Sequence, residues 1–167
     1  MKGLYLGLIA LVAAGSLAAG VTSAVAASPS KGARVKVAVA ASKLGRILVD
    51  GRGRTLYLFE KDKNGRSTCS GACATYWPPL IASGRPLAGA GAKASLLGTT
   101  RRSDGRLQVT YRHHPLYTFV KDTTKGQTNG EGLSVFGAEW YAVSAAGATV
   151  EMSSSSGSSD GSGGYGY

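Results

Sequence analysis

An internal repeat constrains the fold of this chain more than any other feature of its sequence. Residues 45–62 align without a gap with residues 105–122, at a constant offset of 60 positions. Both ranges end in the pattern Leu-Tyr-x-Phe-x-Lys-Asp, and both begin with Gly-Arg. Agreement of this kind is not expected by chance, so the chain contains two copies of one structural unit.

Both copies have the same predicted arrangement of short strands and turns, which favours an all-β fold. In the first copy, strands are expected at 35–41, 46–49 and 55–59, with turns at 42–45 and 50–53. In the second copy, strands are expected at 95–101, 106–111 and 116–119, with turns at 103–105 and 112–115. Further strands are predicted at 139–144 and near 80–81.

A single three-stranded meander cannot cover its own apolar face. We therefore expect two three-stranded meander repeats that pack with pseudo-twofold symmetry as a small sandwich or barrel. Composition agrees with this, since only 17% of residues are charged and 25 of 167 are glycine. Such values argue against a coiled coil or helical bundle. In the strand at 55–59, both faces carry apolar residues, so this strand is expected to be central.

The N-terminal segment 1–26 is predicted to be a secretory signal peptide. It begins with Lys2, continues with an apolar stretch at 4–14 and ends in Ala24-Val25-Ala26, a small-x-small cleavage pattern. We expect cleavage after Ala26 or Ala27; the alternative is an uncleaved membrane anchor. No cysteine lies near this site, so no lipid-modified N-terminus is expected there.

The rest of the chain is predicted to form one domain, because about 115 residues suffice for one core. After a linker at 27–34, the domain is expected to span 35–145, with repeats at 35–82 and 95–145 and an exposed connector at 83–94. The remainder, 146–167, is dominated by Ser and Gly and is predicted to be a disordered tail.

The two cysteines, Cys69 and Cys73, are the only ones in the chain. An even number in an exported protein indicates a disulfide, and the C-x-x-x-C spacing permits one if these residues form a helical turn. The alternative is a redox-active or metal-binding pair. This spacing is not C-x-x-C, however, and no histidine flanks it.

The pattern Tyr-x-Phe-x-x-Asp occurs at 57–62 and at 117–122, and Trp77-Pro78-Pro79-Leu80 follows the cysteine pair. With these motifs, the region from about 35 to 145 resembles the bacterial family of secreted repeat proteins and predicted lipoproteins with a conserved Y-x-(F/W/Y)-x-x-D motif. The resemblance implies an exported domain of largely unknown function. The chain departs from the lipoprotein members because it has no lipobox cysteine.

The motif residues have a structural and a functional interpretation. Each Asp follows a strand, where it is expected to cap a turn, and a buried Tyr is expected to donate to a carboxylate. In the functional interpretation, both pairs converge on the pseudo-twofold axis and line one binding cleft. The candidate binding residues are Tyr57, Phe59, Asp62, Tyr117, Phe119, Asp122 and Trp77.

Other candidate sites are weaker. His113 and His114 are the only histidines and are expected in an exposed loop, with metal ligation as the alternative. Trp77 is expected to pack on the core, and an exposed Trp that stacks on a sugar is the alternative. The sequence shows no catalytic triad order, metalloprotease motif or phosphate loop, so we expect no enzyme and no cofactor.

The net charge of the chain suggests which kind of partner it binds. The formal net charge is +10 at pH 7. Outside the cell, a basic surface meets anionic wall polymers, acidic glycans or membrane headgroups rather than nucleic acid. The sequence therefore predicts a secreted, non-enzymatic module of the cell envelope; the alternative is an extracytoplasmic redox or metal-handling protein that uses the cysteine pair.

Overall fold

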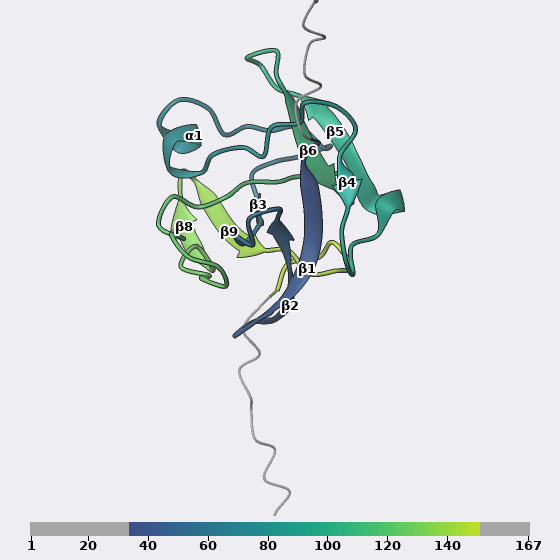
Figure 1. Ribbon diagram of the computed structural model, residues 1–167. Helices are drawn as coiled ribbons and strands as arrows, with labels where there is room; N and C mark the ends of the chain where they lie inside the picture. The colour runs from purple at the N-terminus through teal and green to yellow at the C-terminus, as the bar shows by residue number, and fades with distance from the viewer. Residues whose placement is uncertain (1–33, 151–167) are drawn as a thin grey trace, which may run out of the picture. The chain divides into compact units, whose positions relative to one another are not determined.

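The computed structural model describes residues 34–150, which form short strands with little helix (Figure 1). The strands are β1 (Lys36–Ser42), β2 (Gly45–Asp50), β3 (Tyr57–Phe59), β4 (Leu87–Ala88), β5 (Leu97–Arg101), β6 (Leu107–Tyr111), β7 (His114–Pro115), β8 (Leu133–Val135) and β9 (Ala138–Ala142). The helical elements are α1 (Ala72–Tyr76) and the 3-10 turn η1 (Ala94–Leu96). The all-β expectation is confirmed.

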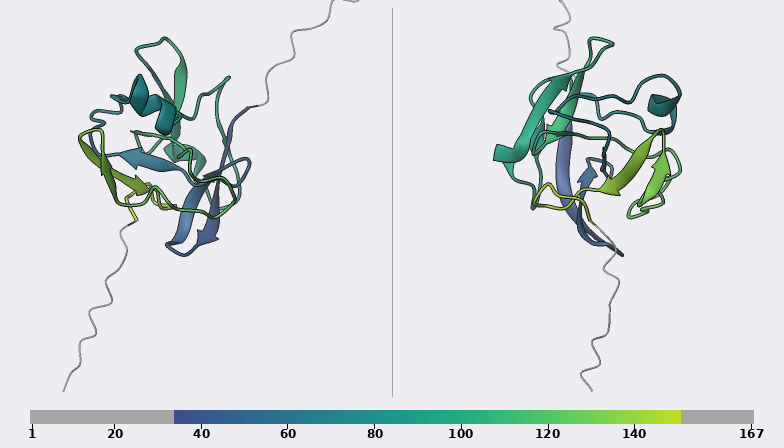
Figure 2. Two further views of the ribbon diagram at one scale, coloured as in Figure 1. Left: turned by 90° about the vertical axis from the view of Figure 1, so that its left-hand side faces the viewer. Right: turned by 180° about the vertical axis from the view of Figure 1, so that it is seen from behind.

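The strands form three small sheets, each with three strands. Their orders are β2-β1-β4, β3-β9-β8 and β5-β6-β7. Isolated bridges join further segments to the sheets, for example Ser144 to Ile47 of β2 and Ile81 to Gln108 of β6. The described residues contain no closed barrel, and the three sheets can be followed separately in the two further views (Figure 2).

The centre of the fold is a direct backbone pairing of the two repeats. The amide N of Tyr57 donates to the carbonyl O of Tyr117 at 2.9 Å, and the amide N of Tyr117 donates to the carbonyl O of Tyr57 at 3.0 Å. Around this reciprocal pair, Leu80 N donates to Leu116 O, and Val143 N donates to Leu56 O. Exchange of equivalent contacts is the pattern of a pseudo-twofold axis, which the repeat predicts.

The two hairpins that begin the repeats differ in turn length. In the first, Ser42 pairs with Gly45 across β1 and β2. In the second, Arg101 pairs with Leu107 and Arg102 N donates to Arg106 O, so the β5–β6 turn is one residue longer. The extra residue changes the register of the second hairpin relative to the constant offset in sequence.

Buried apolar side chains form two clusters. One contains the aromatic rings of both motifs, and the other is mainly aliphatic. Strand β3 and its flanking residue serve both clusters, because Tyr57 and Phe59 lie in the first while Leu56 and Leu58 lie in the second. This alternation confirms that both faces of the strand are buried. The strand is not central in its sheet, because β3 lies at the edge of the order β3-β9-β8 and has only the isolated bridge from Tyr57 to Tyr117 on its other side.

The prediction of a strand at 116–119 is wrong. The structure has the short strand β7 just before it and only isolated bridges at Tyr117, to Tyr57 and to Pro79. A proline has no N–H to donate, so Pro78 and Pro79 cannot extend a ladder beside this segment. The strand expected near 80–81 is also absent, and Ile81 forms only an isolated bridge with Gln108.

The connector expected at 83–94 is mostly exposed, but it contains a strand that the sequence did not predict. Strand β4 lies in it and pairs in parallel with β1. Beyond β4, Gly89 N donates to Val37 O at 2.7 Å, and Val39 N donates to Ala90 O at 2.8 Å. This contact uses backbone groups and glycines, so it leaves no hydrophobic alternation in the sequence.

Several predictions on the chain ends lie outside the described residues: the signal peptide at 1–26, most of the linker at 27–34, and residues 151–167 of the tail. Residues 146–150, which we assigned to the tail, form a turn and a bridge between Val143 and Thr149. Within residues 34–150, no helix has the length and apolar character needed to span a membrane.

The packing of β4 on β1 predicts the effect of a Gly89→Ala substitution. A Cβ at Gly89 would lie 2.8 Å from Ala38 Cβ and 3.3 Å from Val37 O, so the β4 segment must shift. We expect a loss of about 1–3 kcal/mol in the free energy of unfolding, as for overpacked sites, measured by denaturant titration.

The matched control for this prediction is Gly84→Ala in the same connector. A Cβ at Gly84 meets nothing within 4 Å. We expect a change within about 0.5 kcal/mol for this surface site. Equal effects of the two substitutions would contradict the close approach of Gly89 to β1.

Candidate functional site

The Tyr and Asp residues of the repeated motif are bonded crosswise between the two repeats. The hydroxyl of Tyr57 donates to Asp122 Oδ2 at 2.6 Å, and the hydroxyl of Tyr117 donates to Asp62 Oδ2 at 2.6 Å. Both tyrosines are fully buried, and both aspartates are nearly so. The sequence predicted a bond from Tyr to a carboxylate, but it did not show that each bond joins one repeat to the other.

Each motif aspartate also holds the loop that follows it. Asp62 Oδ1 accepts hydrogen bonds from the amide N and the Oγ1 of Thr68, at 2.7 and 2.8 Å. Asp122 Oδ1 accepts one from the amide N of Asn129 at 2.9 Å. The two oxygens of each carboxylate therefore have separate structural partners, one within its own repeat and one across the axis.

A column of stacked rings fills the core between the motifs. Phe59 stacks on Trp140 with ring centroids 4.1 Å apart, Trp140 on Trp77 at 3.9 Å, and Trp77 on Phe119 at 4.3 Å. Tyr57 and Tyr117 meet the two indoles edge-on. Trp77 is fully buried and offers no exposed stacking face, so its indole belongs to the core.

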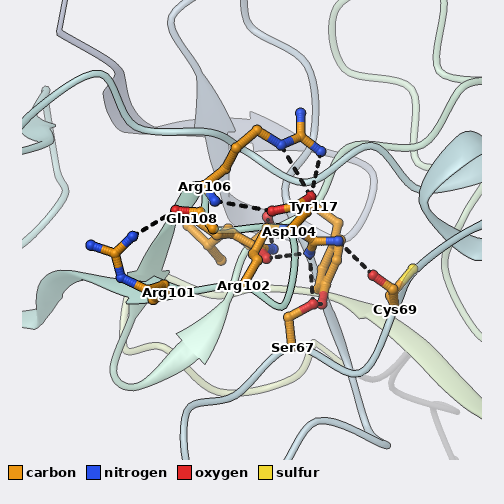
Figure 3. A network of polar contacts seen from close by, with 10 residues as sticks. Ser67, Cys69, Arg101, Arg102, Asp104, Arg106, Gln108 and Tyr117 are labelled. Atoms are coloured by element: carbon orange, nitrogen blue, oxygen red, sulfur yellow. Dashed lines mark hydrogen bonds and ion pairs between the residues drawn. The ribbon is translucent and has the colours of Figure 1, made fainter.

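Arg102 forms a polar network at only one of the two Tyr/Asp pairs (Figure 3). Its side chain is nearly buried, and it donates at 2.7 Å to Ser67 Oγ, to Gln108 Oε1 and to the carbonyl O of Cys69. Ser67 Oγ lies 2.7 Å from the Tyr117 hydroxyl, so the network reaches the motif. At the other pair, Gly130 N donates to the Tyr57 hydroxyl at 3.3 Å.

Burial dominates the electrostatics of these pairs. It raises the pKa of Asp62 and of Asp122, while hydrogen bonds from the tyrosines and from the following loops oppose the shift. Burial and the adjacent carboxylate also raise the pKa of Tyr57, and both effects raise that of Tyr117. The tyrosines therefore act as neutral donors to carboxylates, an arrangement that supports the fold and leaves Tyr57 and Tyr117 no access to solvent.

Cys69 and Cys73 form a disulfide with Cα atoms 5.3 Å apart. The disulfide forms without a helical turn from the first cysteine to the second, because α1 begins only at Ala72 and contains Cys73 alone. The loop before α1 brings Cys69 to the buried Arg102, which bonds its carbonyl oxygen. Both cysteines are buried and belong to the aromatic core cluster, so the disulfide has a structural role.

A first surface pocket lies at His113 and His114. Its volume is about 480 Å³, and its lining also includes Glu60, Asp62 and Lys63. No residue of the other motif copy belongs to this lining, so the two Tyr/Asp pairs do not share this pocket. Burial lowers the pKa of His114, against the opposing charge of Glu60.

Both histidines line this pocket. His113 is exposed in the turn, as expected, but His114 begins β7 and is only partly exposed, so the expectation of an exposed loop is wrong for His114. The residues that the structure describes contain no group of three His, Cys, Asp or Glu side chains positioned to hold a metal ion.

A second pocket is lined mainly by apolar and aromatic side chains and was missed in the sequence. Its volume is about 380 Å³, and its lining residues are Tyr76, Trp77, Phe119, Lys121, Leu133, Val135 and Phe136. Tyr76 is 50% exposed and Phe136 is 40% exposed. The available signal was the dipeptide Phe136-Gly137 between two short apolar runs, which is typical of a hairpin turn with Gly in its second position.

Comparison with known proteins identifies the repeat. The family model described as a secreted repeat of unknown function matches residues 38–81 and again residues 98–144. These ranges correspond to the two copies that meet at Tyr57 and Tyr117. Searches of curated proteins and of solved structures gave no match.

The crosswise bonds predict that Tyr57→Phe and Tyr117→Phe each destabilise the fold. Each substitution removes a donor to a buried carboxylate, so we expect a loss of about 1–3 kcal/mol in the free energy of unfolding. Tyr76→Phe is the matched control, since half of this side chain is exposed, and its effect should stay within about 0.5 kcal/mol. Denaturant titration distinguishes them; three equal effects would count against the bonds.

The raised pKa values of Asp62 and Asp122 predict a pH dependence. Their folded-state pKa values lie above the unfolded value near 3.8. Folding therefore favours their protonated forms. Their contribution to stability is largest below the unfolded pKa and is lost as the pH rises through the raised folded pKa. Between about pH 4 and about pH 7, the double variant Asp62→Asn/Asp122→Asn should lose less stability than the wild type.

This comparison separates the two motif aspartates from other carboxyl groups. Arg106 holds the pKa of Asp104 at about 2, so Asp104 changes stability in the opposite direction and only at lower pH. Glu131, whose pKa burial also raises, is present in both proteins and cancels in the comparison. Identical pH profiles for the double variant and the wild type would contradict the prediction.

Proposed function

The chain belongs to the family of secreted repeats of unknown function, and we propose that it acts as a non-enzymatic binding module of the cell envelope. Its ligands in this proposal are anionic wall polymers or glycans, which its basic surface attracts. The observation that carries the proposal is the unequal distribution of acidic and basic side chains between the interior and the surface.

Basic side chains cover the described surface almost without acidic neighbours. Of the 17 Lys and Arg residues among 34–150, 15 are exposed, whereas only two of the seven Asp and Glu residues are exposed. The exposed basic residues are Arg34, Lys36, Lys43, Arg46, Arg52, Lys61, Lys63, Arg66, Arg85, Lys93, Arg101, Arg106, Arg112, Lys121 and Lys125. A surface of this kind attracts polyanions over several ångströms of solvent.

Most of the carboxylates that could neutralise this surface are instead used for hydrogen bonds within the fold. Asp50 accepts hydrogen bonds from the amides of Arg52 and Arg54 and pairs with the Arg54 guanidinium at 2.8 Å. Glu131 accepts from the amide N of Ala142 at 2.7 Å. With the two motif aspartates, four of the seven acidic residues thus serve the backbone or a buried tyrosine rather than the surface.

The compartment narrows the choice of polyanion. A secreted protein meets wall polymers, acidic glycans and lipid headgroups, and nucleic acid is not the expected partner there. We favour wall polymers and glycans over a membrane surface because their charged groups repeat along a chain and match basic residues that are spread along the described chain from Arg34 to Lys125. Vesicles of anionic lipid distinguish the membrane alternative in a binding assay.

The alternative of a redox or metal-handling protein has no specific support. The disulfide sulfurs belong to buried residues, which limits attack by an external thiolate. In the described part of the chain, no cluster of three ligating side chains accompanies the histidines. We therefore carry only the binding function further.

The charge distribution predicts salt-sensitive binding. Isolated bacterial cell walls should retain the protein at low salt and release most of it as the ionic strength rises, since exposed charges are screened within about 8 Å at physiological salt. Walls from which acid extraction has removed the phosphate polymers serve as the control and should retain less. Retention that does not change with salt or with extraction would contradict a charge-driven function.

A further inference from the structure

The turn between β8 and β9 places a phenylalanine in a backbone conformation that disfavours it. Val135 pairs with Ala138, so Phe136 and Gly137 form a two-residue turn, with φ angles of 61° and 94°. A bulky side chain at positive φ is strained, whereas Asn and Gly fit this kind of turn. The chain itself shows the unstrained solution, because Asn64 and Gly65 form the turn between Lys63 and Arg66 with φ angles of 53° and 71°.

The strain has the effect of presenting an aromatic ring at the surface. Phe136 lies beside Tyr76, with ring centroids 6.2 Å apart and planes inclined by 41°. The two rings border the second pocket, which we call the aromatic groove, and Phe119, Leu133 and Val135 also line it. Apolar surface left open beside a strained residue marks a binding site rather than a need of the fold.

The charges at the aromatic groove are positive. Lys121 belongs to its lining, and Lys61 Nζ lies 3.4 Å from the carbonyl O of Phe136. The one exposed carboxylate on the same hairpin is Glu139, which pairs with Ser134. Because side chains alternate along a strand, Glu139 faces away from Val135 and from the groove.

Trp77 borders the groove from within the core, because its side chain is fully buried. It lines the groove, and its Nε1 is buried without a hydrogen-bond partner among the described residues. Two exposed aromatic rings and two ammonium groups together match a ring that has apolar faces and carries negative charge.

We propose that the aromatic groove binds a sugar ring of an acidic polysaccharide. The apolar face of the ring packs against Tyr76 and Phe136, and a carboxylate or phosphate on the chain pairs with Lys121 and Lys61. This inference rests on the proposed binding of anionic polymers and names the place where a sugar, rather than any polyanion, is recognised.

The test uses the full chain with Phe136→Asn. Asparagine tolerates the left-handed turn, so relief of strain offsets the lost ring contact and the melting temperature should stay close to that of the wild type. Leu107→Asn is the matched control, since Leu107 is 36% exposed and does not line the groove. Tyr76→Ala is a second groove variant, at a side chain that is half exposed.

Two probes separate the sugar from its charge: polygalacturonate, an acidic polysaccharide, and inorganic polyphosphate, a polyanion without rings. We expect Phe136→Asn and Tyr76→Ala each to weaken binding of polygalacturonate about tenfold, which corresponds to losing part of the burial of one aromatic side chain. Binding of polyphosphate should change less than twofold, and Leu107→Asn should affect neither probe.

Other outcomes overturn the inference in distinguishable ways. Wild-type binding of both probes that no groove variant weakens would refute the groove and leave the charge-driven function intact. Failure of the wild type to bind either probe or cell walls would refute both. A wild-type dimer that Phe136→Asn converts to a monomer would show that a second copy of the chain covers the groove.

Discussion

The crosswise pairing of Tyr57 and Tyr117 is the constraint on which the rest of the structure depends. Their backbones form the reciprocal hydrogen bonds at the pseudo-twofold axis, and their hydroxyls bond the aspartate of the opposite repeat. Neither repeat can satisfy its own buried carboxylate with its own tyrosine in this arrangement. The motif therefore makes each copy depend on the other, which explains why the unit occurs as a pair and why the ring column lies between the copies.

The two halves differ mainly outside this symmetric centre. Before Trp77 the chain forms the disulfide loop and α1, whereas before Trp140 it forms the hairpin of β8 and β9. These different segments place Tyr76 and Phe136 side by side at the aromatic groove. Features shared by both repeats are thus buried and serve the fold, while the exposed candidate for ligand recognition arises where the repeats have diverged.

Sequence reasoning succeeded where a pattern reflects side-chain burial. The aligned Tyr-x-Phe-x-x-Asp segments predicted the repeat, and the apolar residues on both faces at 55–59 predicted a strand that is buried on both sides. It failed where backbone groups make the contact: the pairing of β4 with β1 depends on Gly89, and two prolines shorten the ladder at Tyr117. The exposed Phe136 was also missed, because a strained turn residue carries no periodic signal and its neighbour Tyr76 comes from a distant segment.

Burial of the motif carboxylates also links the fold to the proposed function. A chain with nine acidic and 19 basic residues is moderately basic, but the fold increases the imbalance at the surface. Asp62 and Asp122 are committed to tyrosines and loops, and Asp50 and Glu131 to backbone amides, so they cannot form salt bridges with the surface lysines. The acidic groups that the fold uses internally are therefore not available to neutralise the exposed lysines. The same motif that joins the two repeats thereby produces the positive surface through which we propose the protein meets the envelope.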